Sequence, residues 1–168
     1  VIHIPASAIC LVAGLLQLIP IIRQRLPNVH KLSGRLYAAM VLLPLTPTGM
    51  YLGLFAKGGV LGKSAFLFMG LCLLWSTWQG WKHAMRGNIP AHKRWMARSY
   101  ALAAVAITFR FVHIAFFELG MSTDINYVAA TWFSIFLNVA VAELLVSRSY
   151  WYKRFLGGKL NEYSIHAA

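Results

Sequence analysis

Acidic residues are scarce in this chain, since Asp and Glu together number 4 among 168 residues, against 16 Lys and Arg. Hydrolytic chemistry that needs paired carboxylates therefore has few candidates. Cysteine is rarer still: Cys10 and Cys72 both lie inside apolar stretches, which indicates packing and not a disulfide or a metal pair. The chain also lacks a glycine-rich nucleotide-binding loop, an HExxH motif and a CxxC motif, so whether it catalyses any reaction stays open.

Long apolar stretches dominate what is present. Hydrophobic residues make up 59% of the chain, and its mean hydropathy is +0.61. A bilayer core about 30 Å thick is crossed by about 20 helical residues. Five stretches of that length occur, at Val1–Ile22, Leu36–Phe55, Val60–Trp81, Trp95–Phe117 and Tyr127–Val146. We therefore predict an all-α fold, a transmembrane helical bundle of five spans over 1–148, followed by a basic and aromatic cytoplasmic tail at 149–168. Pro44 and Pro47 predict a kink in the second span.

The basic residues are distributed unevenly along the chain. Thirteen of the 16 fall in the first and third connections and after the last span, whereas Lys57 and Lys63 lie in or near the second connection. Basic loops favour the cytoplasmic side of a membrane, so this asymmetry predicts a cytoplasmic C-terminus. The same asymmetry favours contact with anionic lipid headgroups over contact with nucleic acid. Because the chain begins at Val1, within an apolar run and without a methionine, we expect further residues to precede it.

The two largest basic connections resemble each other. His30 and Lys31 are followed by Arg35 and Tyr37, and His92 and Lys93 are followed by Arg98 and Tyr100. This echo suggests two parallel helix-pair repeats followed by one further helix. Similar chemistry at two helix entries would explain the same echo without a repeat.

Polar side chains within the spans are the candidate functional residues, because they are costly in lipid unless they are partnered. Helical spacing puts two groups of residues on one face each: His3, Ser7, Cys10, Gly14 and Gln17 in the first span, and Ser99, Ala103, Ala106, Arg110 and His113 in the fourth. These faces should point toward neighbouring helices. The spacing predicts that His3, Arg110 and His113 converge near the outer leaflet. In the fifth span, Glu143 should pair with Arg98 or Arg35.

Three interpretations of these polar residues follow. Two haem b groups could be held by axial imidazoles, with His30 and His92 as the inner pair and His3 and His113 as the outer pair. Arginines such as Arg98 would lie beside the propionates. A quinone or other amphiphile could be held by His3, Arg110 and His113. Alternatively, the polar groups are structural and satisfy one another within the bundle, and this interpretation applies best to Gln17, Arg35, Tyr37, Asn138 and Glu143.

Several blocks of the sequence resemble one known family. They are Leu15-Leu16-Gln17, the run Leu26–Tyr37, the run Ala91–Leu102 with its Arg-Trp-Met block, Thr108-Phe109-Arg110, and Asn138 with Ala142-Glu143. Together they resemble the bacterial membrane-protein family catalogued as domain of unknown function 2306. In this chain a lysine, Lys93, precedes the arginine of the Arg-Trp-Met block.

The resemblance implies a membrane-embedded helical fold in a bacterial inner membrane, and it names no reaction. It implies signature positions at His3, Gln17, His30, Gly34, Arg35, Tyr37, His92, Trp95, Met96, Arg98, Arg110, Asn138 and Glu143. His113 and His83 are outside that pattern. The leading hypothesis is a redox or electron-transfer component that binds haem b or a quinone. The alternatives are a non-enzymatic accessory subunit of a larger membrane complex, in contact with its other subunits, and a small transporter.

Overall fold

The computed structural model describes the backbone of residues 2–165, and the side chains of residues 2–123 and 125–147. The chain folds into α-helices with one π-helical turn, and the described residues contain no strand. The elements are α1 (His3–Leu18), α2 (Pro20–Arg25), α3 (Pro27–Met40), η1 (Val41–Leu45), α4 (Thr46–Gly53), α5 (Gly59–Met85), α6 (Ile89–Ala103), α7 (Val105–Glu118) and α8 (Thr123–Ile165). The all-α prediction is confirmed. The predicted tail at 149–168 lies outside the residues whose side chains are described.

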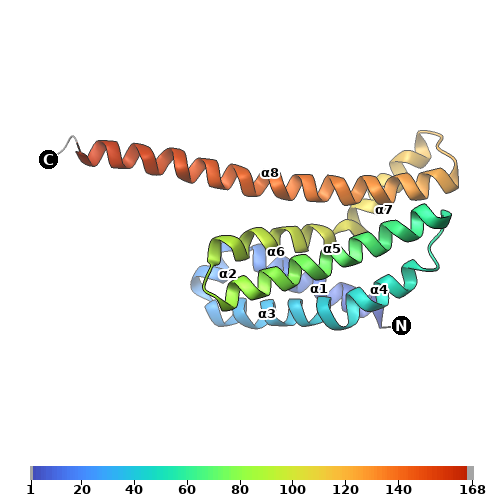
Figure 1. Ribbon diagram of the computed structural model, residues 1–168, viewed down its shortest axis with the longest axis horizontal. Coiled ribbons are helices and arrows are strands. Elements are labelled where there is room, and N and C mark those ends of the chain that lie inside the picture. The colour runs from blue at the N-terminus through green and yellow to red at the C-terminus, as the bar shows by residue number, and fades with distance from the viewer. Residues whose placement is uncertain (1, 166–168) are drawn as a thin grey trace.

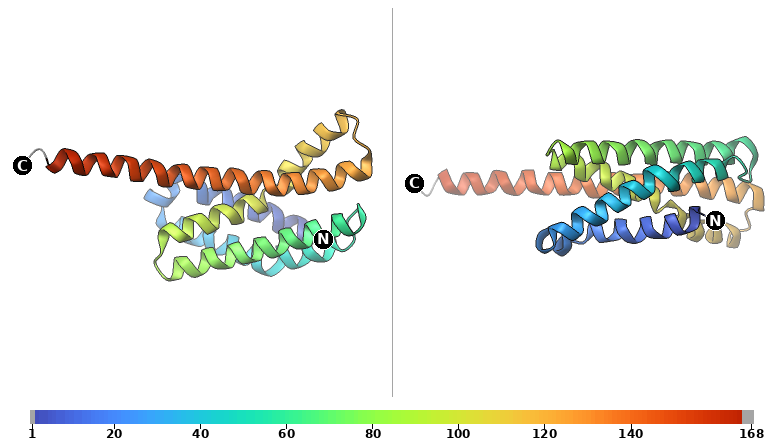
Figure 2. Two further views of the ribbon diagram at one scale, coloured as in Figure 1. Left: turned by 45° about the horizontal axis from the view of Figure 1, so that its top comes forward. Right: turned by 90° about the horizontal axis from the view of Figure 1, so that it is seen from below.

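The helices form an elongated bundle in which α1, α3, α5 and α6 lie roughly parallel to its long axis (Figure 1). The π-helical turn η1 and α4 continue α3, and α7 continues α6. The last helix, α8, packs along α6 and α7 on one side of the bundle (Figure 2). Helices joined by a connection, such as α4 and α5, α5 and α6, and α7 and α8, are antiparallel neighbours, as the short connections predict.

Fewer helices are long enough to cross a membrane than the five that the sequence predicts. Within the described residues, the segments Pro27–Gly53, Gly59–Met85 and Ile125–Ser147 each qualify as spans, and α6 with α7 makes a fourth if the bent pair counts as one. The first helix is only 16 residues long, because it ends before Pro20. A residue before proline is disfavoured in the helical region, and Ile19 is extended, with ψ at 114°. Five spans thus remain compatible with the structure but are not established.

Two helices, α3 with its continuation η1 and α6 with its continuation α7, lose regularity at matching positions. At η1 the amide of Thr46 donates to the carbonyl of Val41, five residues back, and Pro44 lies inside this π-helical turn. The kink predicted near Pro44 and Pro47 takes this form. In the other half, α6 and α7 meet at a bend of 45° around Ala104. Val41 lies as far beyond Arg35 in the sequence as Ala104 lies beyond Arg98.

The centre of the bundle contains small residues and a cluster of buried polar side chains. Tyr37 is fully buried, and its hydroxyl lies 2.8 Å from Oγ of Ser99, which lies 2.7 Å from Oγ1 of Thr77. Gly14 allows the rings of Tyr37 and Tyr100 to approach α1 closely. Large apolar side chains instead face outward: Leu43 is 73% exposed and Phe111 71%. Small residues inside and large apolar residues outside are the arrangement expected of helices surrounded by lipid.

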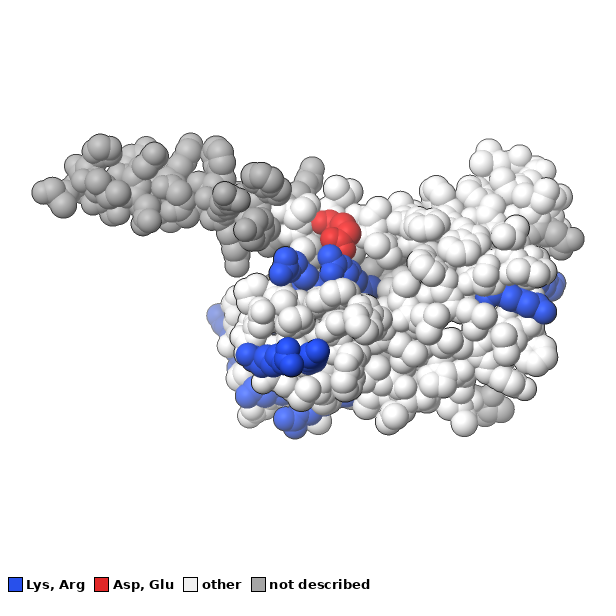
Figure 3. Space-filling model, viewed as in Figure 1, with Lys and Arg blue, Asp and Glu red and all other residues white. Residues whose placement is uncertain are grey.

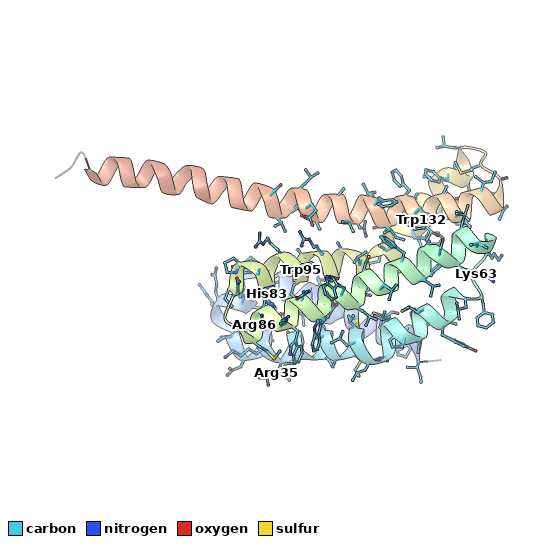
Figure 4. All side chains as sticks on the ribbon, viewed as in Figure 1. Arg35, Lys63, His83, Arg86, Trp95 and Trp132 are labelled. Atoms are coloured by element: carbon cyan, nitrogen blue, oxygen red, sulfur yellow. The ribbon has the colours of Figure 1, made fainter. Side chains whose placement is uncertain are left out.

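Charge is concentrated at one end of this bundle. Lys and Arg gather around the α2–α3 and α5–α6 connections, and a smaller group lies at the opposite end (Figure 3). Arg35, His83 and Arg86 lie at the first of these ends, and Lys63 at the other (Figure 4). We call them the basic end and the opposite end. The first and third connections therefore lie on the same side, as the charge asymmetry predicts.

Candidate functional site

The polar face of α1 points toward neighbouring helices, as its spacing predicts. Cys10 and Gly14 are buried. Nε2 of Gln17 donates to the carbonyl of His30 at 3.0 Å and to Oγ of Ser33 at 2.5 Å, which ties α1 to α3 near the basic end. At the other end of α1, His3 contacts Thr48 on α4. Helical periodicity therefore identified the correct face over the whole helix.

A cavity of about 620 Å³ opens within the bundle toward the opposite end. Its walls come from α1, η1, α4, α5, α6, α7 and α8 together with the α4–α5 connection, and most of the lining side chains are apolar. Its polar lining comprises His3, Ser7, Thr46, Lys57, Arg110, Tyr127 and Thr131. Two of the three residues predicted to converge, His3 and Arg110, thus share this cavity.

His3 is held in place by α4. Its Nδ1 lies 3.1 Å from Oγ1 of Thr48, and the Thr48 hydroxyl in turn donates to the carbonyl of Pro44 at 2.5 Å. Gly49 lies directly against the ring, because a Cβ at that position would come within 3.0 Å of Cε1 of His3. The backbone of α4 therefore fixes the orientation of the imidazole at the cavity wall.

Thr46 offers the cavity an unsatisfied hydroxyl. Its side chain is 2% exposed and lines the cavity, and its Oγ1 has no hydrogen-bond partner among the described residues. A threonine in a helix usually donates to a carbonyl one turn back, as Thr48 and Thr77 do here. An unpaired buried hydroxyl costs about 1–3 kcal/mol, and this oxygen has almost no accessible surface, so a ligand atom would reach it only after the side chain turns.

Arg110 and Lys57 bring positive charge to the cavity. Both residues are exposed, and NH1 of Arg110 donates to the carbonyl of Ala106 at 3.2 Å. No carboxylate lines the cavity among the residues whose side chains are described. An apolar chamber with uncompensated cations at its wall suits an amphiphile whose head carries oxygen acceptors.

His113 is not part of the cavity lining. Its Nδ1 lies 2.8 Å from Oδ1 of Asn126, whose Nδ2 donates to the backbone carbonyl of His113 at 3.1 Å. Phe109 stacks on its ring with centroids 5.3 Å apart, and Phe109 itself lines the cavity. His113 therefore lies outside the cavity, where it joins α7 to α8. The structure does not bring it together with His3.

Two further histidines, His30 and His92, lie at the basic end. Nδ1 of His92 lies 2.8 Å from the carbonyl of Gly80 and links α6 to α5. Nδ1 of His30 is buried and has no hydrogen-bond partner among the described residues. The two imidazoles are close enough to interact electrostatically. No group of three or more His, Cys, Asp or Glu that could hold a metal ion occurs in the described part of the chain.

Glu143 pairs with Arg98, one of the two partners predicted for it. The contact is bidentate: Nε of Arg98 donates to Oε1, and NH2 donates to Oε2 at 3.1 Å. The guanidinium also lies 4.6 Å from the centroid of the Trp95 ring, a cation–π contact that sequence spacing did not identify. Arg98 therefore attaches α8 to α6 and is not part of the cavity lining. Arg35, the other predicted partner, is exposed at the basic end (Figure 4).

Asn138 joins α8 to both sides of the bend in α6–α7. Its Nδ2 donates to the carbonyl of Ala101 at 3.0 Å, and its Oδ1 accepts from Thr108 at 2.8 Å. Like Gln17 and Glu143, it has partners in neighbouring helices. The structural interpretation made from the sequence therefore fits the contacts of these three residues.

Sequence reasoning missed several residues that shape the cavity, namely Thr46, Thr48, Gly49 and Lys57. Their signal was present in the run of Pro44 and Pro47 interleaved with threonines inside an apolar stretch. Prolines remove backbone donors, so neighbouring threonines gain importance as local hydrogen-bonding groups. We had used these prolines only to predict a kink.

The fold and the site together define an integral membrane protein whose helical bundle encloses a largely apolar cavity with a few polar groups. The chain belongs to the family described as "Predicted membrane protein (DUF2306)", whose model matches residues 1–146. No curated protein and no solved structure showed a significant match to the chain.

Proposed function

We propose that this membrane protein binds an amphiphile of the quinone class in the cavity near the opposite end, as a component of membrane electron transfer. The observation that carries the proposal is the shared position of His3, Thr46 and Arg110 on one apolar cavity of about 620 Å³. Small-molecule sites of this size are mostly apolar and contain a few convergent polar groups. A quinone matches both features, because its ring carries carbonyl oxygens and its tail is a hydrocarbon.

Each polar group has a role in this proposal. The hydroxyl of Thr46 donates to one ring oxygen of the quinone and so gains the partner that it lacks within the protein. The guanidinium of Arg110 favours the partial negative charge of the second oxygen. The aliphatic and aromatic wall, which includes Leu45, Met69 and Phe66, receives the tail.

Haem fits this cavity less well than a quinone does. An axially ligated haem b takes two protein ligands, and His3 is the one histidine among the described residues that line the cavity. His113, which we predicted beside it, does not line the cavity. The quinone is therefore the occupant that we propose for this site.

Purified protein in detergent should bind a short-chain ubiquinone, and the cavity variants should weaken this binding. Expected losses of affinity are about threefold to tenfold for Thr46→Val and tenfold or more for Arg110→Gln, since each removes a hydrogen-bonding group worth about 1 kcal/mol or more. Equilibrium dialysis gives the affinity, and solvent extraction followed by mass spectrometry identifies any quinone that co-purifies.

Matched controls are available on the same chain. Lys63→Gln removes a cation at the opposite end and Thr123→Val removes an exposed hydroxyl, and neither residue lines the cavity. Both should bind as the wild type does. Absence of ubiquinone binding would overturn the proposal. It would also be overturned if the cavity variants bound ubiquinone as the wild type does and lost only phospholipid that co-purifies with the protein.

A second candidate function is haem b binding by His30 and His92 at the basic end. One observation favours it: the contact between Nδ1 of His92 and the Gly80 carbonyl places the ring proton on Nδ1, which leaves a lone pair on Nε2. Metal-binding histidines commonly have this arrangement. Nδ1 of His30 is also buried and has no hydrogen-bond partner among the described residues. Haem bound here would supply one-electron transfer, and the cationic residues of the basic end would balance its propionates.

Haem binding predicts an intense Soret band in purified protein, with visible bands that change on reduction by dithionite. His92→Ala should abolish these bands, whereas His83→Ala, at the same end, should leave them unchanged. A colourless wild-type preparation that takes up no added haemin would remove this candidate and leave the quinone proposal untouched.

A further inference from the structure

The contact between His3 and Thr48 determines which ring nitrogen of His3 carries the proton. A threonine hydroxyl has one proton, and Thr48 donates it to a backbone carbonyl, either Pro44 at 2.5 Å or Leu45 at 3.2 Å. Toward His3, 3.1 Å away, its oxygen can therefore act only as an acceptor. Nδ1 of His3 must be the donor, and in the neutral ring Nε2 then carries the lone pair.

The lone pair on Nε2 does not point toward Thr48, because Nδ1 and Nε2 flank Cε1 and their bonding directions diverge. His3 is part of the cavity lining. Gly49 holds the ring against the helix, because any side chain at that position would press on Cε1. The protein thus presents a hydrogen-bond acceptor from a side chain that is often treated as a donor.

Thr46 complements this acceptor. Its hydroxyl is buried at the same cavity and is free to donate or to accept. A quinone offers acceptors only, whereas a quinol offers a hydroxyl on each side of its ring. A quinol hydroxyl can donate a hydrogen bond to Nε2 of His3. A quinone carbonyl has only lone pairs to offer, so its oxygen and Nε2 would repel each other.

We infer that the cavity selects the reduced, hydroxyl-bearing form of its ligand, an aromatic diol of the quinol class, with Nε2 of His3 as the acceptor and Thr48 as the positioning residue. This inference rests on the proposed function and deepens it. It concerns recognition of one form of the ligand and involves no transfer of electrons.

Binding of three probes to the full chain tests the inference. The probes are a short-chain ubiquinol kept reduced under anaerobic conditions, the matching ubiquinone, and the dimethyl ether of the quinol, which keeps its shape but cannot donate. The wild type should bind the quinol about tenfold more tightly than the other two, since one hydrogen bond is gained and a repulsion between lone pairs is avoided.

Variants at Thr48 separate positioning from folding. Thr48→Val removes the acceptor that orients the ring, so the preference for quinol should fall toward one. Thr48→Ser keeps the hydroxyl and should keep the preference. Gly49→Ala should lower it by displacing the ring, and Thr123→Val should have no effect. If Thr48→Val fails to fold, the wild-type preference and its retention in Thr48→Ser still decide the matter.

The outcomes distinguish this inference from the proposed function. If quinol and quinone bind equally and His3→Ala weakens both, the cavity binds quinones but does not select the reduced form, and the inference falls alone. If the ether binds as well as the quinol, the hydroxyl donor is irrelevant and the inference falls again. If none of the three probes binds, both the inference and the proposed function are overturned.

Discussion

Glu143→Ala is expected to destabilise the protein by about 2 kcal/mol, because it leaves the guanidinium of Arg98 without its counter-ion beside the hydrocarbon. The two side chains remain partly exposed, 31% for Arg98 and 46% for Glu143, so the loss should be smaller than for a fully buried pair. Since this pair attaches α8 to α6, the effect should appear as a lower midpoint of unfolding in detergent, measured by circular dichroism against added dodecyl sulfate or temperature.

A double-mutant cycle isolates the ion pair from other effects. Arg98→Met should also destabilise the protein, and it removes the contact with Trp95 as well. Arg98→Met combined with Glu143→Ala should cost less than the sum of the two single substitutions, because no isolated charge remains. Glu118→Ala, at an exposed position on α7, is the matched control and should stay within about 0.5 kcal/mol of the wild type. Equal effects of Glu143→Ala and Glu118→Ala would contradict the importance of the pair.

Features that depend on the period of a helix could be predicted from the sequence. The polar face of α1 follows from spacing alone, and the structure places Cys10, Gly14 and Gln17 against neighbouring helices. The pairing of Glu143 with Arg98 or Arg35 was predictable, because Glu143 is the one acid within the predicted spans and must find a cation there. A charge in lipid restricts its possible partners far more than a charge in water does.

The bend at Ala104 could not be predicted in this way. The sequence around it contains neither proline nor glycine, so Trp95–Phe117 looked like one continuous span. In the structure, Asn138 on α8 donates to the carbonyl of Ala101, which is the acceptor that the amide of Val105 would use in a regular helix. The bend therefore accompanies a contact with a helix far away in sequence, and no local pattern encodes it.

His113 and Arg110 have different surroundings although both lie on α7, beyond the bend. On a straight helix their spacing puts them on one face, and this was the basis for placing both beside His3. Beyond the bend, α7 packs chiefly against α8, where Asn126 binds His113, while Arg110 stays at the cavity. Spacing along α7 therefore placed both residues on one side of the helix but did not show which neighbour each of them meets.

Gly14→Ala is expected to destabilise the protein by about 2 kcal/mol through steric overlap between helices. A Cβ at this position would overlap the ring of Tyr100 and come within 3.0 Å of Cε2 of Tyr37. Neither ring can move freely, because Tyr37 is fully buried and bonded to Ser99, and the Tyr100 hydroxyl donates to the carbonyl of Leu11 at 3.4 Å. The substitution should therefore push α1 away from α3 and α6, with a lower unfolding midpoint in detergent.

Gly80→Ala provides the comparison that makes this prediction specific. A Cβ at Gly80 would come within 2.5 Å of Sδ of Met96, near the end of a flexible side chain that can turn aside. The cost of that adjustment is offset by the gain of about 0.5–1 kcal/mol when alanine replaces glycine within a helix, so Gly80→Ala should be close to neutral. If the two alanines proved equally harmful, loss of glycine itself would be the cause. A large effect at Gly14 alone would show that the rigid tyrosine rings set the separation of the helices, and with it the position of α1 and of His3 at the cavity wall.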